Sequence, residues 1–150
     1  MNIRKINYGE SLPFDLLLEA DPSRKMVKDY INRGECYVAE ELNMIVGVYV
    51  ILPTRPKTVE LVNISVLQSE QGKGIGKKLV LHAIQIAEEF GYQTIELGTG
   101  NSSIGQLAFY QKCGFRIVGV DSDYFIKYYT EEIYENGIRC RDMIRLSKDL

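Results

Sequence analysis

The sequence has no tryptophan, one histidine, three cysteines and four prolines among 150 residues. The three cysteines are odd in number, far apart and without a CxxC pair, which argues against a disulfide framework and against a zinc site. The single histidine, His82, cannot build a metal site alone. The longest apolar run, Met44 to Leu52, is far shorter than the roughly 20 residues of a membrane helix. Residues 1–5 contain no apolar stretch typical of a signal peptide, so we expect a cytoplasmic protein with no metal site and no membrane partner.

The bulk composition excludes further classes of protein. The net charge of −2 creates no global field that would favour nucleic acid, so we expect no nucleic-acid partner. The hydrophobic fraction of 45% and the charged fraction of 25% are those of an ordinary globular protein. No repeat, low-complexity tract or linker divides the chain, so residues 1–150 are expected to form a single domain.

Hydrophobic periodicity predicts the order of the secondary structure. Alternating or β-branched runs predict strands over residues 1–8, 36–40, 45–52, 58–67, 94–97, 116–120 and 143–146. Turns are expected at 41–43 and 53–57. Helices are predicted after the capping signals Ser11, Asp21–Ser23 and Ser102 or Ser103, and from Ile75 to Phe90, where Gly91 stops the helix. The pattern indicates an α/β (α+β) fold whose central sheet, of about seven strands, is mixed, mostly antiparallel and flanked by helices.

A glycine-rich turn lies between the strand at 58–67 and the long helix. Gly72, Gly74 and Gly76 let the backbone approach an anion closely and adopt dihedral angles that other residues avoid. The start of the helix adds unpaired N–H groups and the positive end of the helix dipole. Nearby lysines add positive charge, so this turn is expected to hold a pyrophosphate.

Three known phosphate-binding patterns can be considered for this turn. The P-loop pattern fails because Gly76-Lys77 is followed by Lys78 and no earlier glycine stands at the required distance. The dinucleotide pattern GxGxxG fails because lysines occupy positions 77 and 78. The pattern Gln-x-x-Gly-x-Gly, with Gln71, is met. On the spacing alone, a tight loop beside a solvated lysine face remains an alternative.

The turn resembles the pyrophosphate-binding signature of the Gcn5-related N-acetyltransferase (GNAT) family. A second stretch, Leu107–Phe115, resembles the family's other signature, a helix that ends in Tyr-x-x-x-Gly-Phe. Residues 60–66 are similar to the central strand of the family. The resemblance implies a GNAT-like acyl-CoA N-acyltransferase fold and acetyl-CoA as co-substrate.

The resemblance also implies which residues bind acetyl-CoA. In the family, backbone groups of the central strand hold the pantetheine arm, and here these groups belong to Ile64, Ser65 and Val66. The pyrophosphate would lie on the turn and helix start, which comprise Gln71, Gly72, Lys73, Gly74, Ile75, Gly76 and Lys77. Asn101 resembles the family asparagine that binds pantetheine, although its spacing from Tyr110 is longer than usual. Ser103 stands at the usual spacing, and helix capping is an equally good reason for that serine.

Two residues are candidates for the proton transfers. Tyr110 stands where many family members keep a tyrosine near the sulfur, so its phenol is expected to protonate the leaving thiolate; a core aromatic residue is the alternative. Glu60 opens the central strand, where histone-type members of the family place their general base. A surface glutamate at a strand end is the alternative for Glu60.

One segment of the sequence bears on the acceptor. The segment 121–135 is acidic and aromatic, and such a surface attracts a cationic amine through Coulomb and cation–π contacts. A solvated hairpin explains the same composition. The family resemblance implies transfer to a primary amine by direct attack in a ternary complex, and the composition of this segment favours a small cationic amine as the acceptor. The alternatives are a lysine or N-terminal acetyltransferase of proteins or peptides, a non-catalytic acyl-CoA-binding regulatory module, and a preference for longer acyl chains. Because family members are often dimers, a homodimer is also left open.

Overall fold

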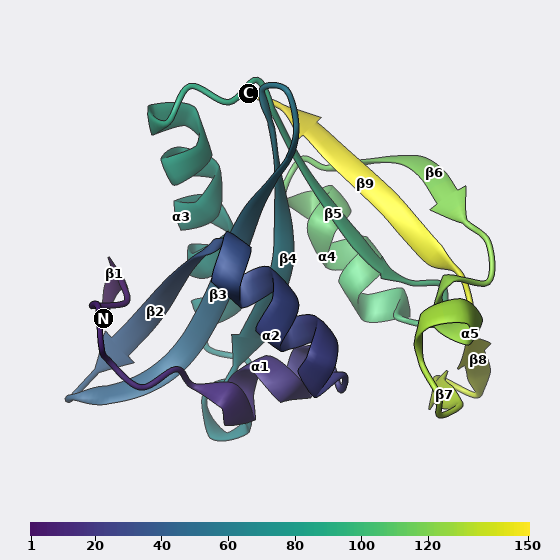
Figure 1. The fold of residues 1–150 in the computed structure, drawn as a ribbon, viewed down its shortest axis with the longest axis horizontal. Coiled ribbons are helices and arrows are strands. Elements are labelled where there is room, and N and C mark those ends of the chain that lie inside the picture. Colours follow the sequence, from purple (N-terminus) through teal and green to yellow (C-terminus); the bar gives the residue numbers. More distant parts are fainter.

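The fold is built on a seven-stranded mixed sheet with helices on both faces (Figure 1). The computed structural model describes residues Met1–Leu150. In sheet order, the strands are β1 (Asn2–Lys5), β2 (Glu35–Glu41), β3 (Met44–Arg55), β4 (Thr58–Val66), β5 (Thr94–Gly100), β9 (Met143–Asp149) and β6 (Arg116–Asp121). Only the β4–β5 pair is parallel. The predicted mixed, mostly antiparallel sheet flanked by helices is thereby confirmed.

The antiparallel meander β2–β3–β4 forms the first half of the sheet, as predicted. The β2–β3 hairpin turns at Leu42 and Asn43, which both have positive φ angles (51° and 63°), the geometry of a tight hairpin. The second turn is shorter than the predicted 53–57, because β3 continues to Arg55 and only Pro56 and Lys57 remain between the strands. The valine-rich and isoleucine-rich stretches of β3 are buried on both faces of the sheet.

Helices cover the two faces of this sheet. Helices α1 (Phe14–Ala20) and α2 (Arg24–Arg33) cover one face, and α3 (Ile75–Glu89) and α4 (Ile104–Lys112) cover the other. Because successive side chains of a strand point to opposite faces, β2 sends Val38 to the α1–α2 core and Ala39 to the α3–α4 core.

The ends of the N-terminal elements differ in part from the prediction. The Ser23 hydroxyl caps α2 by accepting a hydrogen bond from the Met26 N–H at 3.2 Å, as predicted. Ser11 was wrongly predicted as a cap, since α1 starts only after Pro13 and has no side-chain cap. The strand predicted over residues 1–8 is limited to Asn2–Lys5.

The two halves of the sheet separate after a short contact. β4 and β5 pair only where Thr58, Val59 and Glu60 lie beside Thr94, Ile95 and Glu96. Beyond this contact β4 stays with β3 and β5 stays with β9, so the halves diverge as a V that is visible in Figure 1. The divergence leaves a space between β4 and β5 at their carboxyl ends.

The segment between β6 and β9 has structure that was not predicted. It contains a short helix, α5 (Tyr124–Tyr128), and a separate hairpin of β7 (Ile133–Glu135) and β8 (Ile138–Cys140). Both lie beside the lower end of β9 in Figure 1. None of the helices combines the length and the apolar character that crossing a membrane requires.

Candidate active site

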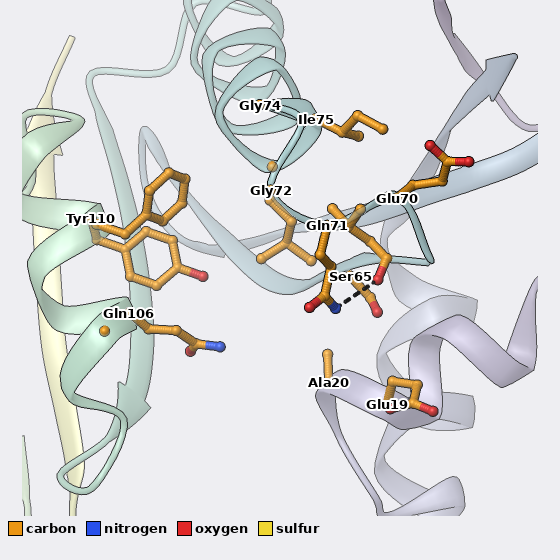
Figure 2. Close-up of a pocket in the computed structure, with 15 residues that line it drawn as sticks. Glu19, Ala20, Ser65, Glu70, Gln71, Gly72, Gly74, Ile75, Gln106 and Tyr110 are labelled. Atoms are coloured by element: carbon orange, nitrogen blue, oxygen red, sulfur yellow. Dashed lines mark hydrogen bonds between the residues drawn. The ribbon is translucent and has the colours of Figure 1, made fainter. Parts of the chain in front are cut away.

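A cleft of ≈ 660 Å³ occupies the space where β4 and β5 diverge. Its walls are the end of β4, the glycine turn before α3, the first two turns of α4 and the end of α1 (Figure 2). The residues that line it are Glu19, Ala20, Ile64, Ser65, Val66, Glu70, Gln71, Gly72, Gly74, Ile75, Gly76, Gly105, Gln106, Phe109 and Tyr110. Motifs that are distant in sequence are therefore brought together around one space.

The glycine turn presents backbone N–H groups to this cleft. Gly72 and Gly74 have φ angles of 80° and 81°, in the left-handed region that glycine adopts without strain. The first intrahelical hydrogen bond of α3 runs from Lys78 N–H to Gly74 O, so the N–H groups of the three preceding residues have no acceptor within the helix. No side chain caps this end of α3. The arrangement suits a bound anion.

The polar side chains of the turn have separate roles. Gln71 donates from Nε2 to the Val66 carbonyl oxygen at 3.1 Å, so this glutamine ties the turn to the end of β4 (Figure 2). Lys73 Nζ lies 2.6 Å from Glu70 Oε2 and balances that carboxylate, which itself lines the cleft. Lys73 and Lys77 do not line the cleft themselves.

The open edge of β4 offers further hydrogen-bonding groups. Leu67 N–H donates to Val46 O of β3 at 2.8 Å. Two residues earlier on β4, Ser65 pairs with Val48 of β3. Successive residues of an antiparallel ladder direct their N–H and C=O groups to alternate sides. Ser65 therefore faces β3, whereas Ile64 and Val66 direct their backbone groups to the cleft. The bond from Gln71 to Val66 O follows the same alternation.

Tyr110 lies deep in the wall of the cleft that α4 forms. Its side chain is buried against Phe109 and Phe115, and its hydroxyl points into the cleft (Figure 2). Burial raises the pKa of Tyr110 to about 12, with a smaller contribution from Cys113. The phenol therefore keeps its proton at neutral pH, as a general acid requires.

A second cavity of ≈ 810 Å³ adjoins the cleft. The two share Glu19, Ala20, Ile64, Gln106 and Tyr110, so a reacting group at this junction is reached from both sides. The second cavity is lined by aromatic side chains of α2 and of the α5 segment, namely Tyr30, Tyr124, Phe125, Tyr128 and Tyr129. Carboxylates from several elements also line it, among them Asp21, Glu60 and Glu135.

Glu60 faces this second cavity from the point where β4 and β5 part. Its side chain is only 21% exposed, and one oxygen, Oε2, lies 3.6 Å from Arg145 Nη1. Burial raises the pKa of Glu60 above its ordinary value, Arg145 opposes this rise, and Glu96 and Asp121 add to it. Glu60 is thus a partly desolvated carboxylate beside a cavity rather than a solvated surface group.

Asn101 and Ser103 both hydrogen-bond to the segment that runs from β7 to β9. Asn101 lines neither cavity; its Nδ2 donates to Arg139 O, and its Oδ1 accepts from the N–H groups of Arg141 and Asp142. Asn101 thus holds the connection between β8 and β9, and its predicted contact with pantetheine has no support in this geometry. Ser103 precedes α4, but its hydroxyl donates to Glu135 Oε1 at 2.8 Å and faces the second cavity.

Asp21 connects the N-terminal helices to the α5 segment beside the second cavity. Its carboxylate accepts hydrogen bonds from the Tyr30 hydroxyl at 3.1 Å, the Tyr129 hydroxyl at 2.8 Å and Ser23 N–H at 3.1 Å. Asn63 of β4 donates to the same Tyr30 oxygen at 2.8 Å. Burial raises the pKa of both tyrosines, so these hydroxyls remain donors.

Sequence reasoning missed Gln106 and Arg145. The Gln106 side chain is held by Thr99, whose hydroxyl donates to Gln106 Oε1 at 2.9 Å, and its nitrogen points into the cleft (Figure 2). Gln106 lies four residues before Tyr110, one helical turn away, which is the only local signal that could have found it. Arg145 reaches the site from β9, and no local pattern indicates this contact.

Comparisons with known proteins show the family of this chain. A model of the acetyltransferase (GNAT) family matches residues 6–115. The uncharacterized N-acetyltransferase YvbK of Bacillus subtilis (strain 168) is 57% identical, and the match covers 100% of both chains. A crystal structure of a GNAT family acetyltransferase from Elizabethkingia anophelis with acetyl-CoA bound has a TM-score of 0.98 and 44% identity, over 99% of this chain and 97% of that one. An IAA acetyltransferase from Bacillus cereus ATCC 14579 has a TM-score of 0.95 and 56% identity, over 99% of both chains.

The chain belongs to the GNAT acetyltransferase family, as the motifs around Gly74 and Tyr110 indicated. It is an acetyl-CoA-dependent N-acetyltransferase, with acetyl-CoA as its co-substrate.

Proposed function

We propose that the cleft binds acetyl-CoA and that the adjoining cavity binds a small cationic amine, which attacks the acetyl group directly in a ternary complex. The observation that carries this proposal is that two cavities meet at Tyr110 and Ile64. One cavity has the anion-binding turn and the unpaired edge of β4, and the other has aromatic faces and carboxylates. Direct attack is supported because the two cavities share residues at one junction.

The binding of acetyl-CoA follows from the backbone groups of the cleft. The pyrophosphate would lie against the N–H groups at Gly74, Ile75 and Gly76, where the helix dipole favours negative charge. The pantetheine arm would pair with the open edge of β4 at Ile64 and Val66. One of these N–H groups would then polarise the thioester carbonyl. Gln106, with its nitrogen directed into the cleft, would donate to the same ligand.

The proton transfers are assigned to Glu60 and Tyr110. The ammonium form of the acceptor gives one proton, through water, to the Glu60 carboxylate, and the free amine attacks the thioester carbonyl carbon. The carbon–sulfur bond breaks, and Tyr110 protonates the departing thiolate. The second proton lost by the nitrogen returns to Tyr110, and Glu60 releases its proton to solvent. The products are an amide, free coenzyme A and one proton.

The cationic acceptor is supported by the composition of the second cavity. Five carboxylates line it, those of Glu19, Asp21, Asp29, Glu60 and Glu135, against three cationic side chains, those of Lys25, Arg33 and Arg145. Tyr128 adds a π face that attracts cations. The segment 121–135 thus supplies part of an acceptor wall, since Tyr124, Phe125, Tyr128, Tyr129, Ile133 and Glu135 all line it.

A panel of acceptors tests this proposal. Release of free thiol would be measured with aromatic and aliphatic cationic amines, with their N-acetylated forms as matched controls, and with a lysine-containing peptide. We expect turnover with at least one small cationic amine and none with the N-acetylated control. Turnover of the peptide alone would favour a protein or peptide acetyltransferase. Tight binding of acetyl-CoA without turnover of any of these amines would exclude a small cationic amine as the acceptor.

Replacement of Glu60 by glutamine tests the general base. We expect kcat/KM for the amine to fall about tenfold at neutral pH, less than the usual range of about 100-fold or more for the loss of a general base, because water in the cavity can accept the proton instead. A base works in its ionised form, so activity of the unaltered protein falls as the pH drops through the raised pKa of Glu60. Glu60→Gln should flatten this acidic limb of the pH–rate profile, whereas an unchanged limb would exclude Glu60 as the base.

A further inference from the structure

Arg145 reaches Glu60 across an intervening strand. Glu60 belongs to β4 and Arg145 to β9, and β5 lies between these strands in the sheet. Arg145 lies directly opposite Gly98 in the β5–β9 pair, so no side chain of the opposite residue stands in the way of the Arg145 side chain. The Arg145 Nη1 atom passes Gly98 and ends 3.6 Å from Glu60 Oε2.

Glycine at position 98 leaves the room for this crossing. A Cβ atom on residue 98 would lie 3.1 Å from Arg145 Nη1 and 2.5 Å from Met143 Sδ. Either distance is shorter than an ordinary van der Waals contact. A side chain at position 98 would therefore displace the Met143 thioether and would force the Arg145 guanidinium to shift by about a few tenths of an ångström.

Other contacts fix the orientation of the Arg145 guanidinium. Its Nε donates to Asp121 Oδ2 at 2.7 Å, and its Cζ lies 5.7 Å from the centre of the Tyr124 ring. The side chain is 30% exposed, so solvent only partly screens its charge. The carboxylates of Glu60 and Asp121 both form ion pairs with Arg145 and balance its charge. Arg145 is therefore not available to bind an anionic substrate.

We propose that Arg145 is a positioning residue that reaches over Gly98 to orient the Glu60 carboxylate and to set the pH range in which it accepts a proton. This inference rests on the proposed function of Glu60 as the base. The groups that face Glu60 are Arg145 from β9, Glu96 from β5, Asp121 from β6 and Tyr124 from α5. Among them Arg145 alone is cationic and favours the ionised carboxylate, while the two acidic neighbours favour the protonated form.

Two substitutions of opposite expected sign test the inference. Arg145→Gln removes the cation, so the acidic limb of kcat/KM for the amine should move to higher pH, by at least about half a unit. Asp121→Asn removes an acidic neighbour, so the same limb should move to lower pH. Arg145→Lys keeps the charge and should restore most of the original profile. The KM for acetyl-CoA should stay within about twofold, since neither residue lines the cofactor cleft.

Gly98→Ala provides a second route that leaves Arg145 in the chain. Its Cβ would meet the ends of two flexible side chains, so it should displace them without preventing folding. Because Arg145 has to move by only about a few tenths of an ångström, the acidic limb should move in the same direction as in Arg145→Gln but by less. In a Glu60→Gln background, none of these changes should move a limb. If the acidic limb of the pH profile stayed in place in both Arg145→Gln and Gly98→Ala while Glu60→Gln flattened the profile, the role of Arg145 would be overturned and the role of Glu60 would stand. An intact limb in Glu60→Gln would instead overturn the role of Glu60 on which it rests.

Discussion

Replacement of Tyr110 by phenylalanine is expected to lower kcat by about 100-fold or more, the usual range for the loss of a general acid. The change removes only the hydroxyl that points into the cleft, and the ring keeps its packing against Phe109 and Phe115. The affinity for acetyl-CoA should therefore change by less than about threefold, because phosphate contacts and strand pairing are untouched. Thiol release at saturating acetyl-CoA would give kcat, and calorimetric titration with coenzyme A would give the affinity.

Tyr49→Phe is the matched control for this experiment. Tyr49 belongs to the same buried core as Tyr110, and its hydroxyl bonds to His82 Nδ1 at 2.8 Å, away from both cavities. This control loses the hydrogen bond to His82, so we expect a loss of about 1 kcal/mol of unfolding free energy without a loss of kcat. If Tyr110→Phe retained full turnover, the thiolate would have to receive its proton from water or from another residue.

Replacement of Gly74 by valine is expected to raise the KM and the dissociation constant for acetyl-CoA by at least about tenfold. A β-branched residue is strongly disfavoured at a φ of 81°, so the turn would shift and its N–H groups would no longer converge on the pyrophosphate. Tenfold corresponds to about 1.4 kcal/mol, within the range of the interaction of an anion with a helix N-terminus. Turnover at saturating acetyl-CoA should be much less affected, and steady-state kinetics with varied acetyl-CoA would separate the two effects.

Gly9→Val separates the effect on the ligand from backbone strain. Gly9 has almost the same φ angle, 82°, and its Cβ would also meet nothing within 4 Å, but it does not line the cleft. Both variants should lose about 1–2 kcal/mol of unfolding free energy, the cost of the left-handed region for a residue with a side chain. Only Gly74→Val should weaken the binding of acetyl-CoA. Equal affinities in the two variants would show that the turn does not hold the pyrophosphate.

The sequence predicted the elements whose formation depends on residues close together in the chain. The long helix from Ile75, the β2–β3–β4 meander and the cap at Ser23 all depend on residues within a few positions of one another. The glycine turn was predictable because a change of periodicity and three glycines coincide at one place. The match to the family motif added the co-substrate, which periodicity alone does not identify.

Contacts between distant residues explain what the sequence did not show. Arg145 meets Glu60 only because β9 inserts next to β5, and a pairing of distant strands leaves no local trace. Asn101 matched a family position approximately, but its side chain is used by a connection about 40 residues later in the chain. Helix α5 spans only Tyr124–Tyr128, too few residues for a helical period to be recognised.

The separation of β4 from β5 gives this sheet an edge inside the protein. An unpaired edge is a liability, because its backbone groups invite pairing with another chain and association of partly opened molecules. Pairing of the pantetheine arm with Ile64 and Val66 would supply the missing neighbour, so acetyl-CoA would act as a structural element as well as a reactant. At a concentration 100 times its dissociation constant, it should stabilise the fold by about 2.7 kcal/mol. Thermal unfolding with and without coenzyme A should show this shift, and the amount of folded enzyme in a cell would then follow the supply of acetyl-CoA.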